Sequence, residues 1–305
     1  MIDLDAVVSL RAIATEGSVA SAAATLGYTP SAVSQQIKRL EKDTGVALLE
    51  RVGRGVVLTE AASRFVAASA PILADLERVR ADLQSVGGDD EAISGELRLA
   101  AFSTAVRGLV IPVLTELSAR HPGLRLPLRE SEPWETVALV ASGQRDLGVT
   151  HQWGGIALSL PDHLVATPLF TDIADVILPE DHPLAHRREL HPGELGDEPW
   201  VATLEGTICR QWLRRLFDGI GGAPRIVHES MEFENHLELA RAGVGVALVP
   251  RLGRAPLGRG LVAIPTAAPA STRDILTVHR RTQADSAALR AVIAALEARA
   301  GVLAE

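Results

Sequence analysis

Apolar residues in the first 45 positions recur at helical spacing, in three stretches separated by glycine or by a turn. The first stretch stops at Gly17, and Ser18 is a favourable N-cap for the second, which stops at Gly27. Thr29 followed by Pro30 is a strong start signal for the third, because proline at the first helical position loses no helical hydrogen bond. The predicted helices cover residues 4–16, 19–26 and about 30–43.

A hairpin and a long helix are predicted to follow. Residues 46–58 carry a Gly-Arg-Gly sequence, with Arg54 at its centre, between two apolar runs, and this pattern is typical of a β-hairpin. Residues 65–86 then repeat apolar side chains in heptads, which indicates a helix that pairs with another helix and suggests dimerisation. Pro71 is expected to kink the first turns of this helix or to mark its start. The glycine- and acid-rich residues 87–91 indicate a flexible linker.

Beyond Gly95 the pattern changes to short apolar runs that alternate with helical stretches. This alternation is typical of an α/β domain. The first set of runs covers residues 97–101, 110–117, 124–128, 137–140 and 147–149. The second set includes residues 176–178, 200–202, 225–227 and 244–249, before a helical tail at residues 286–300.

Composition and charge narrow the choice of partners. The chain has 305 residues, which suits two or three domains, and 47% of them are hydrophobic but only 3% aromatic. Its net charge is −8, yet residues 1–65 are neutral, so the acidic excess lies in the rest of the chain. The only two lysines, Lys38 and Lys42, lie in the third predicted helix. A local basic stripe determines phosphate contact, so the acidic total does not exclude DNA.

The third predicted helix has an apolar stripe and a polar stripe. The apolar stripe comprises Val33, Ile37 and Leu40, and the polar stripe comprises Ser31, Ser34 or Gln35, Lys38 and Lys42. Serine and glutamine side chains hydrogen-bond base edges, while lysine contacts phosphates. The alternative is a helical hairpin with a solvated polar face, because helix-turn-helix spacing alone is a weak signal.

A longer set of positions resembles the LysR-type transcriptional regulators. The matched residues are Gly17-Ser18-Val19-Ala20-Ser21-Ala22-Ala23, Leu26, Ser31-Ala32-Val33-Ser34-Gln35-Gln36-Ile37, Leu40-Glu41, Gly45, Leu48-Leu49-Glu50-Arg51 and Leu58-Thr59-Glu60-Ala61. The chain departs from the family at Leu49, where Phe is frequent, and at Ala62, where Gly is usual. The resemblance implies a winged helix-turn-helix that contacts double-stranded promoter DNA through Thr29, Pro30, Ser31, Ser34, Gln35, Lys38 and, in the wing, Arg54. Gln35 is expected to specify sequence, because its amide can be bidentate to adenine.

The resemblance extends over nearly the whole chain and implies an α/β multidomain fold. The winged helix-turn-helix would cover residues 1–60, and a linker or dimerisation helix with a hinge residues 61–90. Residues 91–305 would form an effector-binding domain of two α/β subdomains, similar to the type 2 periplasmic solute-binding proteins. Subdomain I would take residues 91–166 and 268–305 and subdomain II residues 167–267, with chain crossings near residues 166–168 and 265–271.

A small-molecule effector is expected in the cleft between these subdomains. In open α/β sheets, ligands bind beyond the carboxyl ends of strands, near helix N-termini. The candidate residues follow predicted strands in this way: Phe102, Ser103, Thr104, Thr150, His151, Thr203, Gly206 and Thr207, with Glu229 in addition. For any single Ser or Thr, a simple helix cap is the alternative. The charge of the effector stays open, because the helix N-termini favour an anion and Glu130, Glu132, Glu205 and Glu229 favour a cation.

Other features receive a structural interpretation. Cys209 is the single cysteine, and it is either a packed side chain or, beside Arg210, a redox-sensitive thiol. His182 and His186 are separated by Pro183, which spoils a helical metal pair, so neither a metal nor a cofactor is predicted. We expect a homodimer or homotetramer in the cytoplasm, with DNA, the effector and RNA polymerase as partners and no membrane contact. A transport solute-binding module or an enzyme with an appended DNA-binding domain is disfavoured, because neither a signal sequence nor catalytic spacing is found.

Overall fold

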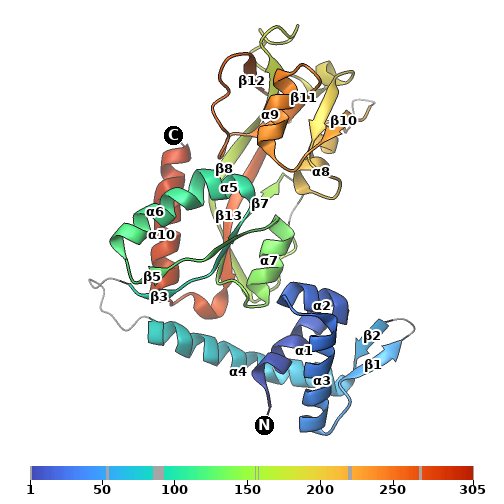
Figure 1. Ribbon diagram of the computed structural model, residues 1–305, viewed down its shortest axis with the longest axis vertical. Coiled ribbons are helices and arrows are strands. Elements are labelled where there is room, and N and C mark those ends of the chain that lie inside the picture. Colours follow the sequence, from blue (N-terminus) through green and yellow to red (C-terminus); the bar gives the residue numbers. More distant parts are fainter. Residues whose placement is uncertain are drawn as a thin grey trace.

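The N-terminal part of the protein is a head of three helices, a hairpin and the start of a long helix (Figure 1). The computed structural model describes residues 2–52, 55–84, 93–154, 156, 158–218, 222–267 and 270–304. The head helices are α1 (Leu4–Glu16), α2 (Val19–Leu26) and α3 (Pro30–Thr44). They match the predicted helices to within a residue at each end, because their boundaries are set locally.

Caps at both ends explain these boundaries. The Ser18 hydroxyl accepts a hydrogen bond from the Ser21 amide at 3.0 Å, and the Thr29 hydroxyl accepts one from the Ala32 amide at 3.2 Å. Gly17 ends α1 in the left-handed region, with φ of 73°, which a side chain would disfavour. The helices bury a shared apolar core, comprising Ala6, Val7, Leu10, Ala12, Ile13, Ala22, Ala23, Leu26, Val33, Ile37, Leu40, Leu48 and Ala62.

A two-stranded wing and a long helix complete the head. Strands β1 (Leu49–Val52) and β2 (Gly55–Leu58) pair antiparallel, as the hairpin pattern predicts. Helix α4 (Glu60–Gln84) follows directly, with its first turn capped by the Thr59 hydroxyl, which accepts from the Ala62 amide at 3.0 Å. Pro71 therefore lies inside α4 and does not mark its start. The predicted linker at residues 87–91 lies outside the described residues.

The rest of the chain forms two α/β subdomains that share one nine-stranded sheet. Its strand order is β10-β9-β11-β8-β13-β7-β4-β6, with β12 also paired to β8. The strands are β4 (Leu99–Ala101), β6 (Leu128–Glu130), β7 (Leu147–Trp153), β8 (Leu164–Pro179), β9 (Pro199–Ala202), β10 (Arg225–Glu229), β11 (Val246–Pro250), β12 (Leu261–Pro265) and β13 (Thr272–Arg280). A separate pair joins β3 (Gly95–Glu96) to β5 (Leu124–Arg125).

Helices cover both subdomains. Subdomain I holds α5 (Ser103–Ala105), the π-helical turn η1 (Val106–Val110), α6 (Ile111–Arg120), α7 (Pro133–Ala141), the 3₁₀ turn η3 (Arg281–Gln283) and α10 (Ala287–Ala304). Subdomain II holds the 3₁₀ turn η2 (Pro192–Leu195), α8 (Ile208–Arg215) and α9 (Phe233–Arg241). Each subdomain has its own apolar core, built mainly from Leu, Val, Ile and Ala in subdomain I and around Trp153, Trp200 and Trp212 in subdomain II.

The chain crosses between the subdomains twice, and β8 and β13 run side by side through the crossing (Figure 1). Strand β8 pairs with β13 as far as Ile173 and with β11 from Ala174 onward. The residues 166–168 expected at the first crossing lie within β8, which continues through them. Pro168 does not end the strand, because it lies beside a bulge opposite Ile275 and Leu276, where a missing amide is tolerated. The interval 265–271, expected for the other crossing, contains the connection from β12 to β13.

Candidate DNA-binding surface and effector cleft

The outward edge of α3 carries the residues predicted to contact DNA. Val33, Ile37 and Leu40 are buried in the head core, which turns the opposite edge of the helix to solvent. The side chains exposed on that edge are Thr29, Pro30, Ser31, Gln35, Lys38 and Lys42, while Ser34 is half-buried. Arg54, predicted to contact DNA from the wing, lies outside the described residues.

These side chains differ in how far they are already committed. The Ser34 hydroxyl donates to the Pro30 carbonyl at 2.8 Å, and the Thr29 hydroxyl lies 3.0 Å from the Ser31 hydroxyl while it caps the helix. Gln35 and Lys38 have no hydrogen bond or salt bridge within the described part of the chain. Of the predicted residues, these two are therefore the most available to a ligand.

Two neighbouring residues hold this edge in place, and the sequence analysis gave neither of them a role. The side-chain amide oxygen of Gln36, Oε1, accepts a hydrogen bond from the buried Ser9 hydroxyl at 2.7 Å, which fixes α3 against α1. The Glu41 carboxylate accepts from the Leu48 amide at 2.8 Å and from the Leu49 amide at 3.3 Å. Glu41 therefore positions the start of the wing relative to α3.

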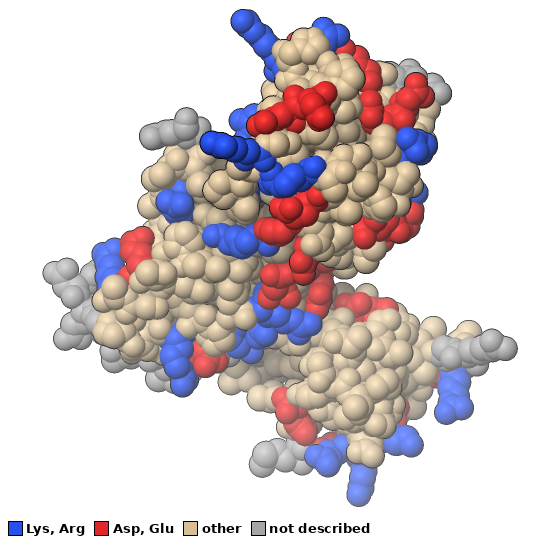
Figure 2. Space-filling model, turned by 45° about the horizontal axis from the view of Figure 1, so that its top comes forward, with Lys and Arg blue, Asp and Glu red and all other residues tan. Residues whose placement is uncertain are grey.

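Charge is distributed differently over the head and the rest of the molecule. Figure 2 shows Lys and Arg side chains along the outer edge of the head, and it shows Asp and Glu side chains interspersed with Lys and Arg over the rest of the molecule. Lys38 and Lys42 of α3 and Arg51 of β1 are all exposed. This distribution suits an outer edge that meets a polyanion.

Most of the predicted effector residues come together at one cavity between the subdomains, which we call the effector cavity. Those that line it are Phe102, Ser103, Thr104, His151, Thr203 and Thr207. Glu132, expected to favour a cationic effector, lines the cavity too, as do Cys209, Met231, Phe233 and Arg273, for which no effector contact was predicted. Phe102 and Thr203 directly follow β4 and β9, which are recognisable in the sequence, whereas Arg273 reaches the cavity only through the tertiary fold.

Three predicted effector residues do not line the effector cavity. Thr150 is buried beside His151 on β7 but lies on the other face of the strand. Gly206 lies in the turn before α8, with φ of 86°. Glu229 is exposed, and its carboxylate forms a salt bridge with Arg210 at 3.1 Å. The structure therefore gives Glu229 a partner within the protein.

Arg273 is buried at the crossing and joins the two subdomains. Its side chain is 1% exposed, and its guanidinium lies 2.8 Å from the Asp172 carboxylate. It also donates to the Thr104 hydroxyl of subdomain I at 2.7 Å. Asp172 in turn accepts from the Leu252 amide of subdomain II at 3.0 Å. The guanidinium carbon lies 5.0 Å from the Phe102 ring centroid, so Arg273 also fixes the aromatic wall of the cavity.

Thr203 and Thr207 on the other wall are engaged within the protein, and Thr207 caps α8. The Thr207 hydroxyl accepts from the Arg210 amide at 3.1 Å and lies 2.7 Å from the Thr203 hydroxyl. The Arg210 guanidinium donates to the Thr203 carbonyl at 3.0 Å. The alternative of a simple helix cap is therefore confirmed for Thr207, because its hydroxyl oxygen already accepts a hydrogen bond within the protein.

Three titratable groups at the effector cavity have shifted pKa values. Burial, and next the charge of Arg273, hold the pKa of His151 well below its ordinary value, so its imidazole is neutral at pH 7. Burial raises the pKa of Glu132, and the neighbouring Glu130 and Glu135 raise it further. Burial raises the pKa of the Cys209 thiol to about 11, which disfavours a reactive thiolate.

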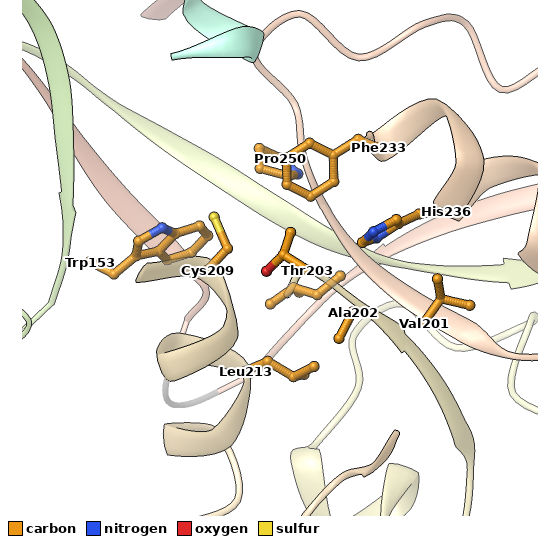
Figure 3. A pocket seen from close by; sticks show the side chains of 10 residues that line it. Trp153, Val201, Ala202, Thr203, Cys209, Leu213, Phe233, His236 and Pro250 are labelled. Atoms are coloured by element: carbon orange, nitrogen blue, oxygen red, sulfur yellow. The ribbon is translucent and has the colours of Figure 1, made fainter. Parts of the chain in front are cut away.

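The cleft is nearly filled in this structure. The effector cavity measures about 20 Å³, and an inner cavity beside it, seen in Figure 3, measures about 10 Å³. Trp153 and Cys209 lie on one side of the inner cavity, and Phe233, His236 and Pro250 on the other. Each space suits a single water molecule, so a larger effector requires the subdomains to separate.

The subdomains also meet through backbone at a second point. A Cβ atom added to Gly108, in the π-helical turn η1, would lie 2.6 Å from the Gly253 nitrogen. The Arg107 guanidinium donates to the Gly253 carbonyl at 3.1 Å and pairs with Glu234 at 3.2 Å. The same segments meet at the buried ion pair, because Leu252 binds Asp172 and Thr104 binds Arg273, so this contact extends the Arg273 junction between the subdomains.

A third cavity, of about 760 Å³, lies between the head and subdomain I. Its lining includes Val8 and Tyr28 of the head and Trp134 and Val137 of α7. No residue of α3 lines it, so the outward edge of α3 stays free of this junction. Among the described helices, none is long and apolar enough to span a lipid bilayer.

A winged helix-turn-helix head joined to a two-subdomain cleft defines a ligand-responsive DNA-binding regulator. Residues 4–63 match the bacterial regulatory helix-turn-helix proteins of the lysR family, and residues 90–301 match the LysR substrate binding domain. The chain belongs to the LysR family of transcription regulators. The resemblance seen in the sequence is thereby confirmed, as is the two-part fold that it implied.

Known relatives agree with this assignment. The chain is 27% identical over 242 residues to the HTH-type transcriptional regulator TtuA of Agrobacterium vitis, covering 79% of this chain and 77% of that one. It is 30% identical to the RuBisCO operon transcriptional regulator of Allochromatium vinosum, covering 78% and 76%.

Solved structures show the same fold. A full-length OxyR variant from Pseudomonas aeruginosa aligns with a TM-score of 0.64 and 20% identity, over 97% of this chain and 98% of that one. Full-length BenM aligns with a TM-score of 0.60 and 21% identity, over 99% and 97%.

Proposed function

We propose that this protein binds promoter DNA as a homodimer or homotetramer and that a small molecule in the cleft between its subdomains alters that binding. The observation that carries the proposal is the availability of Gln35 and Lys38 on α3, beside residues that are fixed in place. Gln36 and Glu41 anchor the helix and the wing, so the exposed edge is presented in a defined orientation. The proposal places the protein in the cytoplasm with its promoter and assigns it no catalytic step or cofactor.

The roles of the DNA-contacting residues follow from their positions. Gln35 would read a base edge in the major groove, and Lys38 would contact phosphate. Thr29, Pro30 and Ser31 lie at the N-terminus of α3, where unpaired amides favour a phosphate. Ser34 would contact DNA only after its hydroxyl leaves the Pro30 carbonyl. Arg54, in the wing, would reach the adjacent backbone or groove.

The long helix α4 supports a dimer. Ile72, Leu76 and Val79 lie four and three residues apart and are 57%, 46% and 54% exposed. Phe65, earlier in the same heptad pattern, packs against the head core instead. The exposed part of the stripe has the spacing of a helix-pairing seam, so we assign it to a second copy of α4. If the protein activates transcription, RNA polymerase would be a further partner.

The cleft supports a coupling between effector and DNA. Its cavities hold about one water each, so an effector would bind the open arrangement of the subdomains better than the closed one. Only such a difference in affinity shifts a population between two states. A change in subdomain separation would alter the spacing of paired heads on DNA.

A gel shift with the upstream region of the protein's own gene tests the proposal. We expect a sequence-specific shift that weakens as salt increases, and a loss of discrimination in Gln35→Ala. The absence of a specific, salt-sensitive shift would overturn it. Sedimentation of Leu76→Glu tests the dimer, since a charge on the seam should yield monomers, whereas Leu303→Glu at the exposed end of α10 is the matched control.

A further inference from the structure

The carboxylates that could meet a cationic effector differ in their availability. Glu205 pairs with Arg214 at 2.6 Å, and Glu229 pairs with Arg210 at 3.1 Å, so both are neutralised within the protein. Glu132 lines the effector cavity, and its side chain forms no hydrogen bond or salt bridge among the described residues. It lies at the N-cap of α7, yet it does not cap that helix. Glu132 is therefore an uncommitted carboxylate at the cavity wall.

The arginines near the cavity offer an anion no comparable partner. Arg273 lines the cavity but is held by Asp172 at 2.8 Å, and Arg210, behind the wall, is held by Glu229. Asp172 already offsets the charge of Arg273, whose Nε and Nη2 groups bind Asp172 and Thr104. An anionic effector that reached the remaining Nη1 donors would therefore gain little net charge attraction, and it would also face Glu132.

His151 gives an independent sign of a missing ligand. Its side chain is only 3% exposed, it lines the effector cavity, and its Nδ1 atom has no hydrogen-bond partner. Buried polar atoms are normally paired, so an unpaired one at a cavity indicates a place for a ligand atom. The imidazole is neutral, so it carries one lone-pair nitrogen that can accept a hydrogen bond from an ammonium group.

Beside the hydroxyls of Ser103, Thr104, Thr203 and Thr207, part of the wall is apolar. Phe233 is 6% exposed and Met231 36% exposed, and both belong to subdomain II, across the cavity from His151. Together with Phe102 they provide flat and flexible apolar surface for the body of a ligand.

We propose that the effector is a primary amine on a compact apolar group, with its ammonium seated by the Glu132 carboxylate and the His151 imidazole. The apolar group contacts Phe233 and Met231, so the ligand touches both subdomains. This inference rests on the proposed function, because it names the chemical class of the effector for the same cleft.

The test compares benzylamine with benzoate and benzyl alcohol, which share a ring and differ in charge. Thermal unfolding of the full chain is followed at equal concentrations of each compound. We expect benzylamine to raise the Tm in a dose-dependent way, benzyl alcohol to raise it less, and benzoate not to raise it, because a ligand stabilises the state that it binds. A larger stabilisation by benzoate, or none by benzylamine at millimolar concentration, would overturn the proposal.

Two variants assign the effect to one carboxylate. Glu132→Gln keeps the shape and removes the charge, and it should weaken benzylamine binding by roughly tenfold or more in a calorimetric titration. Glu130→Gln removes an exposed charge on the neighbouring strand and should retain the binding. His151→Gln is a third variant, and it should also weaken benzylamine binding. The fold of each variant is checked by circular dichroism. Equal binding by Glu132→Gln and the parent protein would contradict the assignment.

A gel shift without any amine separates this inference from the proposed function. Specific DNA binding combined with a preference for benzoate would overturn the amine proposal and leave the proposed function intact. Absence of specific DNA binding by the parent protein would overturn the proposed function itself.

Discussion

The cations of the head and those of the cleft are arranged in opposite ways. On α3, Lys38 and Lys42 are exposed and have no salt bridge among the described residues. In the cleft, Arg273 is buried and held by Asp172, and Arg210 is buried and held by Glu229. A free, hydrated cation suits a polyanion that binds through many weak contacts. A paired, buried cation holds structure, so the same charge is available for recognition in one region and is used for rigidity in the other.

The largest effect is expected from Arg273→Met. The substitution leaves the Asp172 carboxylate buried without its guanidinium, and breaking such a pair costs about 3–5 kcal/mol of folding free energy. Thermal or denaturant unfolding of the full chain measures the loss. The double variant Arg273→Met, Asp172→Leu should recover part of it, because no unpaired charge remains.

The control is Arg251→Met. Arg251 also pairs with a carboxylate, Asp175, but its side chain is 47% exposed and Asp175 keeps a second partner in Arg254. A smaller loss of stability is expected. If both variants lose equally, burial does not distinguish the arginines of this domain.

A second effect is expected when acid forces a charge into the cleft. The pKa of His151 lies well below 6.5 in the folded protein because of burial, whereas the unfolded chain takes up a proton near pH 6.5. The unfolded state therefore binds more protons below pH 6.5, and stability falls by up to about 1.4 kcal/mol per pH unit. Denaturant unfolding at pH 7.5, 6.5 and 5.5 measures this slope.

His151→Gln should flatten the slope, whereas His186→Gln, at an exposed position, should leave it unchanged. Comparing each variant with the parent protein at the same pH cancels the contribution of Glu132. Because the pKa of Glu132 is raised by burial, that contribution has the opposite sign and stabilises the folded state as the pH falls toward 4.5. An unchanged slope in His151→Gln would show that the imidazole is charged in the fold.

The smallest effect is expected from Lys38→Ala. Loss of one phosphate contact should weaken DNA binding by roughly fivefold at physiological salt and reduce the salt slope by about one. Folding stability should not change, because the side chain is exposed and unpaired. Gel shifts at several salt concentrations measure the slope. Arg290→Ala, on α10, removes the same charge far from α3, and an equal loss in both variants would assign the effect to net charge alone.

How far the sequence predicts a feature depends on how local its cause is. The caps at Ser18 and Thr29 act within three residues, so the head helices could be predicted almost to the residue. Arg273 and Asp172 are 101 residues apart and meet only because β8 and β13 pair, so no local pattern indicates them. The continuation of β8 through Pro168 is not indicated locally for the same reason, since the bulge that accommodates the proline forms between distant strands.

The effector residues fall between these limits. Ser103 and Thr104 follow the end of β4, which is visible in the sequence, and the structure brings them to one cavity with His151, which lies inside a β7 that is longer than predicted. Glu229 is the last residue of β10, but its partner Arg210 is supplied by a helix whose placement the sequence does not reveal. The same limitation left the choice between a cationic and an anionic effector open. That choice depends on which charged side chains form salt bridges within the protein, and these salt bridges form only in the tertiary fold.

The backbone contact between Gly108 and Gly253 has a mechanical consequence. A Cβ at either position would meet backbone atoms of the other subdomain at 2.6 Å or less, so the two backbones are in direct contact there. The contact adjoins the crossing strands, because the neighbouring Leu252 amide donates to Asp172 of β8. A cleft that opens must therefore either break this backbone contact or rotate about a point close to it.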